Sequence, residues 1–207
     1  MDFEERVSEY LLKKEEEDKE KHKNLPHVYS ISSLGYCPRS IYFDKVAPVE
    51  ESEETKSIFI VGNILHEWVQ NNLYKDCNFE VEIEKKMDDI TLRGRIDIIN
   101  DFEIVELKTT SSLSYQRKPK EEHIVQINTY MGLTGVHKGK IVYIQKNDFH
   151  SKTFEVKFNQ NIFDETIKKI KKIDKQITDN IEYKDITPRM SPNCYYCKYR
   201  SFCLGIV

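Results

Sequence analysis

The spacing of apolar residues alternates between helical and strand-like periods along the chain, which predicts an α/β protein. Several stretches repeat apolar residues every three or four positions, as the buried face of a helix requires. A turn-rich segment at 32–39 leads into a short helix that we expect to run through Phe43. The longer helices are predicted at residues 1–23, 57–74, 123–136 and 159–181.

Strict alternation of apolar and polar residues predicts half-buried strands in the middle of the chain. Phe79, Val81 and Ile83 show this alternation, with a glutamate between each pair. Turn residues at 100–101 and 147–148 join neighbouring strands into two hairpins. The predicted strands are 79–87, 91–99, 102–109, 140–146 and 152–158. We therefore expect a central mixed sheet of about five strands flanked by helices.

The composition is that of a soluble globular protein, with 39% hydrophobic and 32% charged residues in 207. No apolar run approaches the roughly 20 residues of a membrane span, and the charged first 24 residues lack a signal-peptide centre, so we expect a cytoplasmic protein. The net charge is −3, with 32 basic and 35 acidic side chains. An overall basic nucleic-acid binder is thus excluded, and any DNA contact must come from local basic patches.

An acidic centre is predicted where the first hairpin turns. If the turn at 100–101 holds two residues, Asp97 faces Ile104, and alternation puts Glu106 and Lys108 on the same side of the sheet. A three-residue loop would reverse this parity. Two carboxylates suit Mg²⁺ or Mn²⁺, and a nearby ammonium group can stabilise charge that develops on a phosphate. Taken alone, a Glu-x-Lys pair is more often an ordinary solvated ion pair.

Four motifs, in order along the chain, change that assessment. They are G-x-x-x-H at 62–66, G-R-I-D at 94–97, E-L-K-T-T at 106–110 and Q-x-x-x-Y at 126–130. In this order they resemble the RecB-like branch of the PD-(D/E)xK nuclease superfamily. The resemblance implies a restriction-endonuclease-like core that cleaves nucleic acid with the help of a divalent metal.

The resemblance also assigns roles to single residues. It implies that His66, Asp97, Glu106 and the backbone carbonyl of Leu107 bind the metal, and that Lys108 is the catalytic lysine. A neutral imidazole suits Mn²⁺ better than Mg²⁺, although a lone histidine on an apolar helix is more often a packed core residue.

The last motif contributes two further candidates. Gln126 and Tyr130 lie one helical turn apart and share a face, which the family places beside the active site. There they can orient Lys108 or a phosphate, so we count both among the catalytic residues. Without the resemblance, the pair reads as a helix surface with one buried tyrosine.

The cysteines are unevenly distributed. Cys194, Cys197 and Cys203 crowd the C-terminus, where metal or cluster ligation is a better explanation than disulfides in a reducing compartment. Cys37 is the fourth candidate ligand, and Cys77 is expected to be a buried thiol. Similarity to CRISPR-associated iron–sulfur exonucleases, which have one cysteine upstream and three at the C-terminus, implies a four-iron four-sulfur cluster. Spacing alone favours structural Zn²⁺.

We divide the chain into a helical region at 1–56 that contributes Cys37, a nuclease core at 57–185, and a cysteine segment at 186–207 that closes on Cys37. The tyrosines of the cysteine segment are read as packing around the cluster rather than as base-stacking groups. Basic side chains near the catalytic strands are candidate DNA contacts, namely Arg39, Arg93, Arg95, Arg117, Lys118 and Lys120.

Together, the motifs and the resemblance predict a Mg²⁺- or Mn²⁺-dependent nuclease that hydrolyses single-stranded DNA. The resemblance favours 5′-to-3′ exonuclease activity, with endonuclease activity in addition. The alternative is a DNA-end-binding accessory subunit of a CRISPR adaptation or recombination complex with weak or partner-dependent cleavage. Expected partners are single-stranded DNA or DNA ends and CRISPR, recombination or replication proteins. The sequence leaves assembly into a homo-oligomer open.

Overall fold

The computed structural model describes residues 2, 6, 9, 10, 13, 25–74 and 77–205. The helix predicted at 1–23 lies outside the continuously described part of the chain. None of the described helices combines the length and the apolar run that a membrane span requires.

The described strands are β1 (Val28–Ser30), β2 (Asn78–Met87), β3 (Ile90–Ile99), β4 (Ile104–Thr110), β5 (Lys138–Gln145) and β6 (Ser151–Lys157). The helices are η1 (Ile31–Ser33), α2 (Pro38–Val46), α3 (Glu53–Leu73), α4 (Glu121–Thr134), α5 (Gln160–Thr178), η2 (Tyr183–Asp185), η3 (Pro192–Tyr196) and α6 (Arg200–Leu204).

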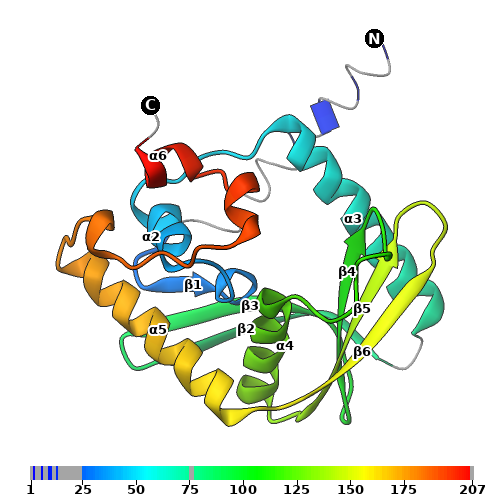
Figure 1. Cartoon of the computed structure of the whole chain (residues 1–207). Helices are drawn as coiled ribbons and strands as arrows, with labels where there is room; N and C mark the ends of the chain where they lie inside the picture. Colours follow the sequence, from blue (N-terminus) through cyan, green and yellow to red (C-terminus); the bar gives the residue numbers. More distant parts are fainter. Residues whose placement is uncertain are drawn as a thin grey trace.

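The strands form one mixed six-stranded sheet around β3 (Figure 1). β2 runs antiparallel along one edge of β3. The other edge is shared: β1 pairs in parallel with residues 91–93, and β4 pairs antiparallel with residues 98–99. β5 then continues parallel to β4, and β6 antiparallel to β5. The predicted α/β fold is confirmed. β1 was not predicted because three residues are too few to show a period.

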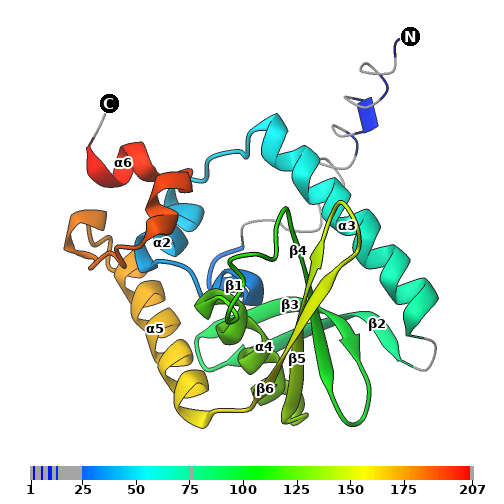
Figure 2. The ribbon, with the colours of Figure 1, turned by 45° about the vertical axis from the view of Figure 1, so that its right-hand side comes forward.

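The sheet is covered on both faces (Figure 2). α4 and α5 cover one face, where the larger apolar cluster includes Ile96, Ile104 and Ile127. α3 crosses the other face, over a smaller cluster that includes Val69, Ile98 and Leu107. Residues of β4 therefore alternate between two buried environments, and its even-numbered positions face α4.

The turn between β3 and β4 differs from the prediction. It has four residues, 100–103, because the Asn100 side chain accepts hydrogen bonds from the backbone N–H groups of Phe102 and Glu103. Ile99 consequently pairs with Ile104, not with Phe102. The two-residue turn was wrong, but the register changes by two positions, so the predicted parity is retained.

The alternation of β3 is interrupted at Asp97. Ile96 and Ile98 are two residues apart and yet belong to different apolar clusters. The pairing of β2 with β3 skips Glu80, whose backbone has a φ of 51°. Such a left-handed conformation is typical of an irregularity in a strand, and it lies where the candidate acidic residue leaves the regular sheet.

Candidate active site

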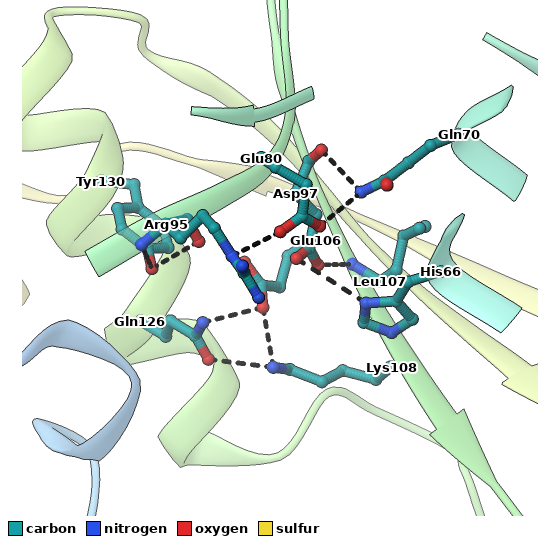
Figure 3. A network of polar contacts seen from close by, with 10 residues as sticks. All are labelled: His66, Gln70, Glu80, Arg95, Asp97, Glu106, Leu107, Lys108, Gln126 and Tyr130. Atoms are coloured by element: carbon teal, nitrogen blue, oxygen red, sulfur yellow. Dashed lines mark hydrogen bonds and ion pairs between the residues drawn. The ribbon is translucent and has the colours of Figure 1, made fainter. Parts of the chain in front are cut away.

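Asp97 connects β3 to β4 through its side chain (Figure 3). The two strands pair through only two backbone positions, and beyond them the carboxylate Oδ2 accepts a hydrogen bond of 2.8 Å from the Leu107 N–H. Gln70 of α3 holds the backbone at Asp97, since its side-chain amide donates to the Asp97 carbonyl at 3.0 Å and to the Glu80 carboxylate at 2.8 Å. Asp97 is thus fixed by backbone and side-chain contacts.

Glu106, Lys108 and Gln126 form a closed triangle of hydrogen bonds. Lys108 Nζ donates to Glu106 Oε1 at 2.7 Å and to Gln126 Oε1 at 3.0 Å. Gln126 Nε2 donates to the same Glu106 oxygen at 2.8 Å. The triangle fixes the orientation of the Gln126 amide, because only its oxygen can accept from the ammonium group. Gln126 therefore positions Lys108, as its place in the predicted motif suggests.

Glu106 is buried, with 1% of its surface exposed, and its second oxygen Oε2 has no hydrogen-bond partner in the part of the chain that the structure describes. Burial, followed by repulsion from Asp97, raises the pKa of Glu106 to about 7. Burial alone would lower the pKa of Lys108, but attraction to Glu106 and Asp97 outweighs it and raises that pKa. A buried carboxylate with an unsatisfied oxygen and a second carboxylate nearby is an arrangement that a divalent cation would stabilise.

His66 approaches the acidic pair from α3. Its Nδ1 lies 3.7 Å from Asp97 Oδ1, which is close but longer than a hydrogen bond. Gly62, one turn earlier, permits this approach, because a Cβ there would lie 3.3 Å from Thr109 Oγ1 of β4. The three predicted ligands therefore lie together. Within the described residues, however, no three His, Cys, Asp or Glu side chains form a complete metal site as they stand.

Tyr130 contacts the backbone of β3 rather than Lys108. Its hydroxyl donates to the Arg95 carbonyl at 2.9 Å and accepts from the Arg95 N–H at 3.2 Å. Gly94 is required there, since a Cβ would lie 2.7 Å from the hydroxyl oxygen. Tyr130 is thus a positioning residue for the strand that carries Asp97, and the glycine of the G-R-I-D motif accommodates it.

The predicted DNA-contacting residues other than Arg39 fall into two groups. Arg93 and Arg95 are paired with Glu84 and Glu80 of β2. Residues of the loop before α4 are exposed, and these are Arg117, Lys118 and Lys120.

Arg39, the sixth predicted DNA contact, makes hydrogen bonds within the protein. Its guanidinium group donates to the carbonyl oxygens of Ile186, Lys184 and Cys203, at 2.7, 3.1 and 3.4 Å. It thereby ties α2 to the C-terminal segment. Sequence reasoning missed this because the carbonyl groups lie about 150 residues further along the chain.

A pocket of about 320 Å³ opens beside Lys108. One wall is apolar and comes from α3 and the loop before α2, including Phe59, Ile58 and Tyr36. The other lining groups are polar or basic and include no aspartate or glutamate. They are Asn63, His66, Lys108, Thr109, Thr110, Gln116, Lys120, His123, Tyr143 and Lys146, together with the backbone at Gly62 and Leu107.

The four predicted cluster cysteines also lie in one region. Burial raises the pKa of the Cys197 thiol, and so does the proximity of Cys194, Cys37 and Cys203. Backbone N–H groups of the segment that precedes η3 point at sulfur: Arg189 donates to Cys37 at 3.2 Å, and Ser191 to Cys194 at 3.5 Å. Such N–H···S contacts suit thiolates that hold a metal or a cluster. Cys77 lies apart, next to Asn100.

Comparison with known proteins identifies relatives of the whole arrangement. Residues 71–204 match the family model of the PD-(D/E)XK nuclease superfamily. The match covers the acidic centre and the three C-terminal cysteines, whereas His66 and Cys37 lie before it.

The chain is 27% identical to the CRISPR-associated exonuclease Cas4 of Saccharolobus solfataricus, over 95% of this chain and 97% of that protein. Among solved structures, SSO0001 shares 24% identity over 97% of both chains, with a TM-score of 0.66. The alkaline exonuclease of Laribacter hongkongensis is 13% identical, with a TM-score of 0.57 over 76% of this chain and 91% of that one. With two acidic residues and a lysine held together on the matched segment, this chain belongs to the PD-(D/E)XK nuclease superfamily.

Proposed function

We propose that the protein is a metal-dependent deoxyribonuclease that hydrolyses phosphodiester bonds of single-stranded DNA as a 5′-to-3′ exonuclease, with endonuclease activity in addition. The observation that carries the proposal is the buried Glu106 carboxylate. One of its oxygens is held by Lys108 and Gln126, and the other has no partner. A structural ion pair would satisfy both oxygens, whereas a ligand for a cation keeps one available.

The residues present fit a hard divalent cation, Mg²⁺ or Mn²⁺. Among the described residues Glu106 Oε2 has no hydrogen-bond partner, and Asp97 uses Oδ2 for the Leu107 N–H while Oδ1 lies 3.7 Å from His66 Nδ1. Carboxylate oxygens are the ligands that such cations prefer. His66 and the Leu107 carbonyl would complete the set, and the imidazole favours Mn²⁺. When bound, the cation would activate water and neutralise charge on the phosphate.

The side chains of this protein supply the remaining chemistry. Lys108 stays protonated because Glu106 and Asp97 raise its pKa, so it can donate to a water or to a phosphate oxygen but cannot act as a base at neutral pH. Gln126 holds the ammonium group in one direction. Asp97 keeps β3 and β4 at the separation that places these groups together.

We extend the proposal to the cysteines and to the biological setting. Cys37, Cys194, Cys197 and Cys203 would hold a four-iron four-sulfur cluster, or Zn²⁺ as the alternative, with a structural role. The similarity to a CRISPR-associated exonuclease supports a role in CRISPR adaptation, with recombination or replication proteins as alternative partners. The domain boundaries at 56 and 185 and a homo-oligomeric state remain predictions.

Lys108→Ala tests the proposal. We expect cleavage of end-labelled single strands in Mn²⁺ to fall by at least about 10²-fold, because an oriented donor to the reacting phosphate is lost. The thermal unfolding midpoint should change little. Strands blocked at the 5′ or the 3′ end, and duplexes of the same sequence, would report polarity and strand preference.

Lys168→Ala is the matched control, since this α5 lysine has a side chain that is 77% exposed and forms an ion pair with Glu165, one helical turn away. It should cleave like the unaltered protein. Full activity in a folded Lys108→Ala variant would refute the assignment of the catalytic lysine, and metal-independent cleavage would refute the role of the cation.

A further inference from the structure

His123 is a polar residue of the active-site pocket that none of the nuclease motifs includes. It lies on α4, three residues before Gln126 and seven before Tyr130, so all three share one helix face. It lines the same pocket as Lys108. No sequence pattern marks His123, although it stands about one helical turn before Gln126.

The hydrogen bonds around Tyr143 determine which ring nitrogen of His123 carries the proton. The Tyr143 hydroxyl has two partners, the Lys120 N–H at 2.9 Å and His123 Nδ1 at 2.7 Å. A backbone N–H can only donate, so the single hydroxyl hydrogen of Tyr143 must go to Nδ1. Tyr143 is 2% exposed, and any other assignment would leave its hydroxyl hydrogen without an acceptor among the described residues. The neutral imidazole then carries its hydrogen on Nε2.

The surroundings keep this imidazole neutral. Burial, Lys108 and Lys120 together lower the pKa of His123 to about 3. Burial also raises the pKa of Tyr143, which keeps the hydroxyl hydrogen in place. Tyr143 itself is fixed by its strand, since it pairs with Lys108 across β4 and β5. The result is an N–H donor of fixed direction that adds no charge to a pocket already containing Lys108, Lys120 and Lys146.

We infer that His123 is a substrate-positioning residue whose Nε2–H donates a hydrogen bond to a phosphate oxygen of the bound strand. This phosphate is the neighbour of the one that Lys108 contacts. Tyr143 sets the required tautomer of His123. This inference rests on the proposed function. The ligand is a phosphodiester because the pocket lining offers cationic and N–H donors and no carboxylate. The apolar wall of Ile58 and Phe59 lies in the same pocket, where the sugar or base of that nucleotide can pack.

Two substitutions of similar polarity separate a substrate contact from a packing role. The amide of glutamine reaches the position of Nε2, whereas the amide of asparagine reaches only that of Nδ1. We therefore expect His123→Gln to retain KM for labelled single strands within about threefold. His123→Asn should raise KM by about tenfold or more with little change in kcat, because a hydrogen bond to a charged phosphate is lost. If His123 only packed against Tyr143, the order of the two variants would be reversed.

Tyr143→Phe tests the tautomer argument. It should raise KM in the unaltered background, because Nδ1 can then hold the hydrogen. In the His123→Gln background it should have no further effect, since an amide needs no tautomer to be set. Equal effects in both backgrounds would overturn the role of Tyr143.

The outcomes also separate this inference from the proposed function. If the unaltered protein fails to cleave DNA with Mg²⁺ or Mn²⁺, the proposed function fails and the inference with it. If the unaltered protein cleaves, and His123→Asn and His123→Gln have the same KM and unfolding midpoints, only the inference fails.

Discussion

The acidic centre and the cysteine region are built in opposite ways. The acidic centre lies on long strands and helices, and hydrogen bonds from Leu107, Lys108 and Gln126 hold one oxygen of each carboxylate in place. The cysteine region consists of η3 and α6, with five residues each, and is joined to α2 by Arg39 and by contacts to sulfur. We conclude that the fold holds the residues of the first site in place before any cation binds. For the second region, the proposed metal or cluster is expected to contribute to folding.

Cys197→Ser should give the largest effect on stability. If a cluster or zinc ion holds the C-terminal segment, removing one ligand should cost that segment more than about 5 kcal/mol, because the metal-binding free energy contributes directly to its folding. We expect loss of bound iron or zinc and rapid proteolysis within residues 186–205, with a resistant core. Cys77→Ser, at a thiol outside the group, should keep both metal content and resistance. An equally resistant Cys197→Ser protein would remove the contrast between the two regions.

Glu106→Gln should raise the free energy of unfolding of the metal-free protein near neutral pH, whereas Cys197→Ser should lower it. Because the folded pKa of Glu106, about 7, lies above the ordinary glutamate pKa of 4.5, the folded state binds more protons than the unfolded state between those pH values. The metal-free protein should therefore lose stability as pH rises from about 4.5 to 7, by on the order of 1–3 kcal/mol. Glu106→Gln should abolish this loss, together with cleavage.

Urea unfolding in chelator at pH 5 and pH 8 measures the effect. Glu84→Gln is the control, since that carboxylate is 57% exposed and pairs with Arg93. It should leave the pH dependence unchanged. Added Mn²⁺ should stabilise the unaltered protein at pH 8 and leave Glu106→Gln unaffected. If the free energy of unfolding of Glu106→Gln still fell between pH 5 and pH 8, a group other than Glu106 would cause the pH dependence.

Arg39→Lys should have the smallest effect, about 1–2 kcal/mol of unfolding free energy. Lysine keeps the charge but cannot reach three carbonyl oxygens with one planar group. The loss should be confined to the C-terminal segment and be measurable by hydrogen exchange there. Arg117→Lys, on the exposed loop before α4, should show none. Reduced DNA affinity in Arg39→Lys with an unchanged C-terminal segment would instead support the predicted DNA contact of Arg39.

The parts of the fold that follow from local periodicity were predictable. The alternation in β2 is clear from the sequence, whereas the place of Gln126 near Lys108 was implied by the family resemblance of the Q-x-x-x-Y motif. The length of the turn at 100–103 was not predictable from Asn100 and Asp101, because the Asn100 side chain closes a longer turn by bonding two N–H groups. The parity was correct only because the error was an even number of residues.

Contacts between distant segments could not be read from the sequence. The hydrogen bonds from Arg39 to the C-terminal segment and the tautomer of His123 depend on partners from other elements, and no local pattern marks them. The irregularity at Asp97 is likewise invisible, because it arises from the conformation of Glu80 on the neighbouring strand. Motifs indicated which residues matter, and tertiary contacts determine what each of them does.

The hydrogen bond from the Leu107 N–H to Asp97 has a consequence for inactive variants of this enzyme. Asp97 replaces a missing rung of the β3–β4 ladder, so Asp97→Ala would disturb the architecture as well as the chemistry. The Lys108 ammonium group instead bonds to two other side chains, those of Glu106 and Gln126. A catalytically silent protein that still folds, whether made in the laboratory or arising by descent, is therefore more easily reached by losing the lysine than by losing the aspartate.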